Sequence, residues 1–244
     1  MSVDPIPAGE AQLRIGSRPS AAAALTTERV SDAASRAAAL AIVREVYLEE
    51  KGWLADADRE LPESAADSRD SSSTSWFLAR CGGEPAGVVR LTYDPSLELP
   101  SAAGVEIDAG IDLDRLARSG RFVEIGRLMI SPRFRSRTAV VLALMRTALA
   151  EVVARGYSHL LTVVFEDDPH SPYGFHTRVL GFERIGSHRY GELSCASRRI
   201  LLILDIARAA ERLRGPRAKL LQALAGGLER ELAGLSATRP GPQV

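Results

Sequence analysis

The stretch EIGRLMISPRFRSRTAVVLALM, from Glu124 to Met145, reads as a strand, a tight basic turn and a helix. The turn has no glycine and carries Arg133, Arg135 and Arg137 at alternate positions, just before the helix that begins at Thr138. A helix N-terminus presents unpaired N–H groups and partial positive charge. An anion bound there would satisfy both the arginines and the N–H groups. These four residues are therefore predicted to bind a phosphate.

The alternative is that an arginine-rich chain simply exposes three arginines on a surface turn. Of the 31 basic residues, 29 are Arg and 2 are Lys, a bias typical of a GC-rich bacterial genome. The formal net charge is zero, so no overall field favours nucleic-acid binding. Four scattered histidines show no metal-ligand spacing, and no metal is expected.

The composition is that of an ordinary globular protein with a sizeable core, at 45% hydrophobic and 25% charged residues in 244. Cys81 and Cys195 form no CxxC motif and stand in no secretory context, so a reduced, cytoplasmic protein is expected. The N-terminus lacks the features of a signal peptide. No apolar segment approaches the roughly 20 residues of a membrane span.

Hydrophobic periodicity and turn residues predict a mixed α/β (α+β) protein built on a central sheet. After a flexible tail at 1–10, the expected strands are Ala11–Gly16, Trp76–Arg80, Ala86–Tyr93, Phe122–Ile130, Leu160–Phe165, Glu183–Arg189 and Arg198–Ile206. A Ser/Ala linker follows the first of these strands, and an acidic, serine-rich loop or lid is expected at Leu54–Ser75. The expected helices are Ser31–Glu50, Asp112–Arg118, Thr138–Arg155, a short one before Gly181, Ala207–Leu213 and Arg217–Leu235.

The predicted organisation is a catalytic-type domain at 11–206, helices at 207–235 and a tail at 236–244. The Arg217–Leu235 helix has a leucine stripe. This stripe is expected to pack on the domain or on a dimer mate; contact with a membrane surface or a carrier protein is the alternative.

Three patches and one helix give the chain a family resemblance. The patches are IVREVYLEEKGW (Ile42–Trp53), GVVRL (Gly87–Leu91) and EIGRL (Glu124–Leu128), and a later helix ends in Gly181-Phe182. Their order resembles the GNAT superfamily of acyltransferases, and more closely its N-acyl amino acid synthases and acyl-homoserine lactone synthases. The resemblance implies a GNAT-like, mostly antiparallel sheet flanked by helices, with no tightly bound cofactor.

The resemblance also implies the donor and the acceptor. The basic turn lacks the glycines with which GNAT enzymes cradle the pyrophosphate of coenzyme A. The single phosphodiester of an acyl-phosphopantetheine arm, carried by acyl carrier protein, is therefore the expected donor, with acyl-CoA as the alternative. The expected reaction moves a fatty acyl group onto the amine of an amino acid or a similar small amine, in a monomer or homodimer.

Within this resemblance Glu124 is the expected acceptor of the amine proton. Strict alternation would place Glu124 and Arg127 on opposite faces, but Gly126 permits a β-bulge that brings them to one side. The alternative is a structural ion pair.

Five further residues have expected roles. Arg44 and Arg90 are expected to hold an acceptor carboxylate, or else to form ion pairs. Trp53 is expected to wall a pocket, or else to be plain core. His176 stands where GNAT enzymes often have a tyrosine and is expected to protonate the leaving thiolate, with Tyr173 as the alternative donor.

Three rival functions stay open. A lactone synthase using S-adenosylmethionine would carry an aromatic residue among the acids after Trp53, which DADRE (Asp56–Glu60) lacks. A CoA-dependent N-acetyltransferase would be expected to keep the glycines of the turn. The non-enzymatic rival is a silent GNAT-like module that binds an acyl carrier.

Overall fold

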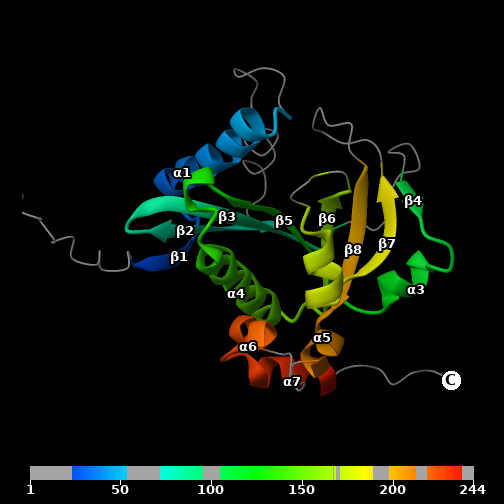
Figure 1. Cartoon of the computed structure of the whole chain (residues 1–244). Helices are drawn as coiled ribbons and strands as arrows, with labels where there is room; N and C mark the ends of the chain where they lie inside the picture. The colour runs from blue at the N-terminus through cyan, green and yellow to red at the C-terminus, as the bar shows by residue number, and fades with distance from the viewer. Residues whose placement is uncertain are drawn as a thin grey trace, which may run out of the picture.

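The computed structural model describes residues 24–53, 72–95, 105–166, 168, 171–188, 198–212 and 219–237. In this part of the chain eight strands form one sheet in the order β1-β2-β3-β5-β6-β8-β7-β4 (Figure 1). All neighbouring strands are antiparallel except β5 and β6, which are parallel. The mostly antiparallel sheet that the sequence predicted is confirmed. The strands are β1 (Leu25–Arg29), β2 (Thr74–Cys81), β3 (Glu84–Tyr93), β4 (Val105–Ile107), β5 (Phe122–Ile130), β6 (His159–Phe165), β7 (Glu183–His188) and β8 (Arg199–Asp205).

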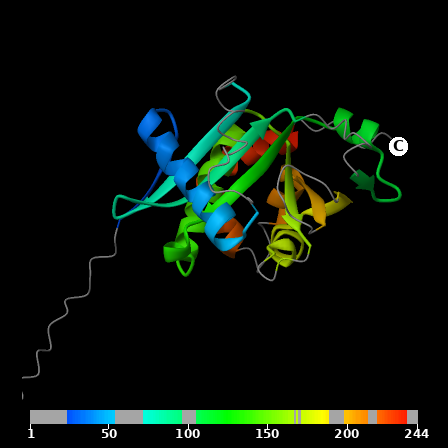
Figure 2. The same ribbon diagram turned by 90° about the horizontal axis from the view of Figure 1, so that it is seen from above.

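Helices cover both faces of the sheet. Helix α1 (Ala33–Arg44), continued by the π-helical turn η1 (Glu45–Glu50), lies across β2, β3 and β5 on one face (Figure 2). The other face carries α4 (Thr138–Ala154), with α5 (Ile206–Arg212), α6 (Lys219–Ala225) and α7 (Glu229–Ala237) beneath it (Figure 1). Shorter helical pieces are α3 (Leu113–Arg118), the 3-10 turn η3 (Pro132–Phe134) and the π-helical turn η4 (Phe175–Leu180).

Each face of the sheet buries its own apolar cluster. On the α1 face Val43 and Tyr47 pack against Trp76, Leu78 and Val88. On the α4 face a larger cluster joins the sheet to α4 and to the C-terminal helices; it includes Leu91, Val123, Leu144, Leu202 and Leu224. The helix periodicity of α4 is confirmed at Leu144, Ala148 and Val152, which are fully buried.

The ends of α1 and the edges of the sheet differ from the sequence prediction. Asp32, not Ser31, caps α1: its Oδ1 accepts from the Ser35 N–H at 2.7 Å in a capping box. Strand β1 lies in the stretch that the sequence predicted to be a linker. Its polar residues form a half-exposed edge strand and lack the apolar alternation by which a strand is predicted. The three-residue β4 was also missed. The predicted first strand (11–16) and most of the predicted lid (54–71) lie outside the described residues.

The predicted C-terminal helix is in fact two helices. Gly227 has φ 87°, in the left-handed region, and α6 ends just before Gly226 and Gly227. The leucine stripe nevertheless packs on the domain as expected, since Leu224 and Leu232 are buried in the core and Leu228 packs against it.

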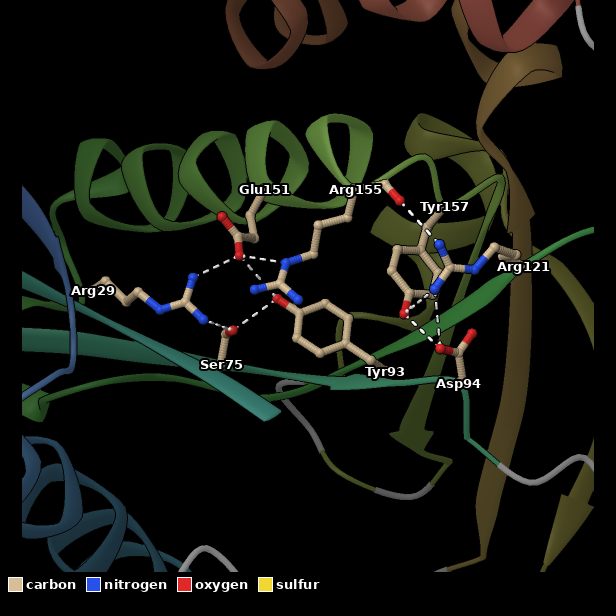
Figure 3. Close-up of polar contacts among 8 residues, drawn as sticks. All are labelled: Arg29, Ser75, Tyr93, Asp94, Arg121, Glu151, Arg155 and Tyr157. Carbon is tan, nitrogen blue, oxygen red and sulfur yellow. Dashed lines mark hydrogen bonds and ion pairs between the residues drawn. The ribbon is translucent and has the colours of Figure 1, made fainter. Parts of the chain in front are cut away.

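A polar cluster ties the start of β5 to the ends of β3 and α4 (Figure 3). The rings of Tyr93 and Tyr157 stack at 5.3 Å between centroids, with Arg155 over the first ring and Arg121 over the second. Tyr157 donates its hydroxyl hydrogen to Asp94 at 2.7 Å and accepts from Arg121 at 2.8 Å. This set of five residues is called the tyrosine cluster below.

Gly87 of the GVVRL patch sits where no side chain fits. A Cβ there would lie 2.9 Å from the Met129 carbonyl oxygen and 2.7 Å from Ile130 Cδ1. Because the carbonyl belongs to the paired strand β5, relief requires the sheet to shift. We expect Gly87→Ala to lower the free energy of unfolding by about 1–3 kcal/mol, as measured by urea denaturation. Gly83→Ala would be a poor comparison, because Gly83 has a φ of 87°, at which a side chain adds strain. Ala86→Gly is used instead, since it removes a Cβ one position away from where Gly87→Ala adds one.

Candidate active site

The candidate site begins at a β-bulge in β5. Residues Arg90 and Val88 of β3 pair with Gly126 and Met129, so that Val89 alone faces Arg127 and Leu128. The bulge that the sequence predicted is therefore present. Its strain is carried by Arg127, whose φ is 52°, rather than by Gly126. A left-handed arginine costs about 1–2 kcal/mol, and such outliers concentrate at functional sites.

The bulge brings Glu124 and Arg127 to the same face of the sheet. Before it, Glu124 and Gly126 point to the α1 face; after it, Arg127 lies over the Tyr47 ring of η1, at 5.5 Å to the centroid. Leu128 packs in the opposite core, beneath α4. The extra residue has thus reversed the alternation, as expected.

Gly126 keeps the space between a carboxylate and a guanidinium open. A Cβ at Gly126 would lie 3.3 Å from Glu124 Oε1 and 3.6 Å from Arg90 Nη2. Among the described residues no hydrogen bond or ion pair engages Glu124 or Arg90, and Arg90 Nε is buried without a partner. The structural Glu124–Arg127 ion pair is not formed. Two charged groups therefore converge on an open point of the α1 face.

Aromatic side chains wall this point. Trp53 lies 4.3 Å from Phe165 and 5.7 Å from Tyr47 between ring centroids. Lys51 lies over the Trp53 ring and forms a 2.7 Å ion pair with Asp168. The sequence expected Trp53 at the wall of a pocket, and the structure places it half-buried beside β6.

Arg44 is half-buried at the last position of α1, and no described residue forms an ion pair or hydrogen bond with it. Its expected partnership with Arg90 stays a prediction.

The three arginines of the basic turn point in different directions. Arg133 pairs with Glu84 at 3.3 Å, and Arg137 donates to the Cys81 sulfur, both on the β2–β3 hairpin. Arg135 instead forms an ion pair with Glu50, at the end of η1. All three arginines are exposed, which fits both the predicted phosphate site and its alternative, a plain surface turn.

The N-terminus of α4 behind this turn is uncapped. Arg137 occupies the cap position with no side-chain hydrogen bond to the helix, and Thr138, the first helical residue, is exposed. In the first turn of this 17-residue helix Val140 donates its N–H to the Arg137 carbonyl at 2.9 Å, and the N–H groups before it are left for solvent or a ligand.

Strands β5 and β6 separate in the middle of the sheet. They pair only from Phe122/His159 to Ile125/Thr162, although β5 runs on to Ile130 and β6 to Phe165 (Figure 1). At the last paired position Thr162 donates its hydroxyl to the Ile125 carbonyl at 3.0 Å. Beyond it the facing edges have backbone groups available to a ligand that inserts between the strands.

An apolar cavity of about 90 Å³ lies below this separation, on the α4 face. His176 and Thr162 are the polar side chains of its wall among the described residues. The remainder is aliphatic or aromatic and comes from the sheet, α4, η4 and the C-terminal helices. We call it the acyl cavity, for a reason given below; its lining includes Val89, Leu128, Met145, Ala148, Leu180, Ile206, Ala210, Leu224, Ala225 and Leu232.

His176 and Tyr173 differ sharply in environment. His176 is buried, and its Nδ1 lies 2.9 Å from the Pro172 carbonyl oxygen, which can only accept, so Nδ1 carries the hydrogen. Burial lowers the pKa of His176 despite this hydrogen bond. The neutral ring therefore presents Nε2 as an acceptor. Tyr173 is 38% exposed and lies just before η4.

The bulged β5, the separation of β5 from β6 and the helix that starts behind the basic turn define an acyltransferase of the GNAT fold. A family model of the N-acyl amino acid synthase FeeM matches residues 38–201. The chain belongs to that family. No curated protein sequence matches it.

Solved structures show the same fold. The structure of FeeM, an N-acyl amino acid synthase from uncultured soil microbes, superposes with a TM-score of 0.60 at 18% identity, covering 81% of this chain and 98% of that one. An N-acetyltransferase from Staphylococcus aureus Mu50 gives 0.52 at 12% identity, over 75% and 98% of the two chains. A ribosomal-protein-alanine N-acetyltransferase from Brucella melitensis gives 0.51 at 13%, over 74% and 99%.

Two further findings bear on the site. No helix in the described ranges is long and apolar enough to cross a bilayer. Within those ranges, no three His, Cys, Asp or Glu side chains gather as metal ligands. The acidic run Asp56–Glu60 lies outside them.

The acyl cavity was missed by the sequence analysis. Its walls come from ten segments spread between Val89 and Leu232, each with ordinary core residues. The available signal was the set of alanines Ala209, Ala210 and Ala225 on the C-terminal helices, but small residues predict a space only when the opposite wall is known.

Proposed function

We propose that the protein transfers an acyl group from acyl carrier protein to the amine of an amino acid or a similar small amine. The observation that carries this is the position of the acyl cavity, directly below the separation of β5 and β6 and across the sheet from Glu124 and Arg90. In this proposal the apolar acyl tail binds on the α4 face of the sheet and the polar acceptor binds on the α1 face, at the same opening between β5 and β6.

In this arrangement the phosphopantetheine arm enters between β5 and β6 and the acyl tail lies in the cavity. The acceptor lies on the α1 face, where Arg90 and Arg127 would bind its carboxylate. Trp53 and Tyr47 would cover it. Arg44 also binds the carboxylate if its side chain turns toward the bound acceptor.

The chemistry is aminolysis of a thioester. The amine nitrogen attacks the thioester carbon, the C–N bond forms, and the C–S bond breaks. Glu124 takes the amine proton, directly or through water, and the thiolate leaves as a thiol after protonation. We favour the Tyr173 hydroxyl as that proton donor, because a buried His176 must first become an imidazolium, which its lowered pKa opposes.

Donor choice is tested by product mass spectrometry with pooled amino acids. One tube holds acyl carrier protein thioesters and the other the matching coenzyme A thioesters. An acyl-amide in the carrier tube supports the proposal and identifies the acceptor. Product only with coenzyme A would overturn the carrier assignment. S-adenosylmethionine in a third tube tests the lactone synthase, and no product from folded protein in any tube would favour the silent binding module.

The basic turn makes a separate prediction. Arg133→Gln is expected to raise KM for the acyl donor about tenfold, the loss of one charge-assisted hydrogen bond, with kcat unchanged. The Arg133–Glu84 pair is mostly exposed, so stability should hold. Arg208→Gln is the matched control, because Arg208 likewise pairs with one exposed glutamate, Glu183. Equal KM values for the two variants and wild type would remove Arg133 from the donor site.

A further inference from the structure

We infer that the C-terminal helices α5–α7 set the length of the acyl chain that the protein accepts. This rests on the proposed function, since it assigns the acyl tail to the cavity. The helices lie beyond residue 201, where the match to the family model ends. In this proposal chain-length selection depends on helices outside the stretch that the family model matches.

The position of these helices makes them the floor of the acyl cavity. Thr162, which donates to the Ile125 carbonyl at the last paired position of β5 and β6, marks the end near the strand separation. The sheet supplies the roof, and α5–α7 lie on the far side, beneath α4 (Figure 1). The floor is formed by Ile206, Ala209, Ala210, Leu224, Ala225 and Leu232.

The cavity above the floor is small, and it exists because several floor residues have small side chains. The cavity of about 90 Å³ is smaller than the roughly 150 Å³ that suffices to bind benzene in an apolar protein interior. Every methyl group on the floor therefore competes directly with carbons of the acyl tail. Ala225 is buried at the end of α6, and Leu224 beside it is equally buried.

The floor is held against α4 and the sheet. Arg146 of α4 donates to the Gly226 carbonyl at 2.7 Å, at the break between α6 and α7. Leu224 and Leu232 pack in the apolar core. A longer chain must displace these side chains to enter further, which places a graded penalty on each added carbon.

The test is a series of saturated acyl chains from about four to about sixteen carbons. Ala225→Leu adds three carbons to the floor and is expected to shift the preferred length down by about three carbons. Binding of the longest chains should weaken by roughly 10- to 100-fold, at about the transfer energy of one CH₂ per carbon displaced. Ala223→Leu, on the exposed side of the same helix, should leave the profile unchanged.

Two readouts separate this inference from the proposed function. Binding of free fatty acids, measured by calorimetry, requires no amide formation; the chain lengths of products are measured by mass spectrometry. A shifted binding profile without any product would support the floor and overturn the proposed reaction. Product formation with identical length profiles in Ala225→Leu and wild type would overturn the floor alone.

A second variant covers the case in which Ala225→Leu does not fold. Ala210→Val adds two carbons at a half-buried position of α5 and demands less repacking. It should shift both profiles down by about two carbons. An unchanged profile in a folded Ala210→Val protein would also contradict the inference.

Discussion

Glu124→Gln is expected to lower kcat by roughly 10²- to 10⁴-fold, the usual contribution of a general base. The substitution keeps the shape of the side chain and removes its ability to hold a proton. Since no described residue forms an ion pair or hydrogen bond with Glu124, the free energy of unfolding should stay within about 0.5 kcal/mol of wild type. The measurement is steady-state kinetics with the donor and acceptor that the product assay identifies.

A second substitution separates a base from a merely polar neighbour. Glu124→Asp keeps a carboxylate that can take the proton, and it should retain more activity than Glu124→Gln. Glu106→Gln, on the exposed strand β4, serves as the control because it removes one carboxylate of the same sheet far from the bulge. A Glu124→Gln enzyme within about twofold of wild type would assign the proton to water or to the acceptor itself.

The bulge shows what sequence reasoning can reach. Glycine between Glu124 and Arg127 correctly predicted an extra residue in β5, because the alternation of side chains alone could not bring both charges to one face. It did not indicate which residue takes the left-handed φ, since a glycine also serves to leave space. Because Gly126 has no Cβ, it leaves room for the side chains of Glu124 and Arg90, and Arg127 adopts the left-handed φ.

What the sequence could not give depends on contacts between distant segments. The separation of β5 from β6 follows from how β6 stays paired with β8 along its whole length while β5 turns toward β3. No local sequence pattern indicates which neighbouring strand each of them pairs with. The pKa of His176 is a similar case: its residue type suggested a proton donor, and burial beside the cavity lowers the pKa instead.

The tyrosine cluster also escaped prediction, and it makes a clear stability prediction. Burial, together with the hydrogen bond to Asp94, raises the pKa of Tyr157 to about 12, above the ordinary value of 10. The folded state thus holds this proton more tightly than the unfolded state. Its contribution to stability is complete below pH 10 and is lost as pH rises from 10 toward 12.

Tyr157→Phe is therefore expected to lower the free energy of unfolding by about 1.5–3 kcal/mol at pH 7, the value of hydrogen bonds to charged groups. The melting temperature should fall by about 3–12 °C. The difference from wild type should shrink between pH 10 and pH 12, because wild type alone loses this contribution there. Urea denaturation across that range measures it, with Tyr173→Phe as the control, since Tyr173 is exposed. A Tyr157→Phe protein as stable as wild type at pH 7 would mean that the stacked ring, not the hydroxyl, holds β3, β5 and α4 together.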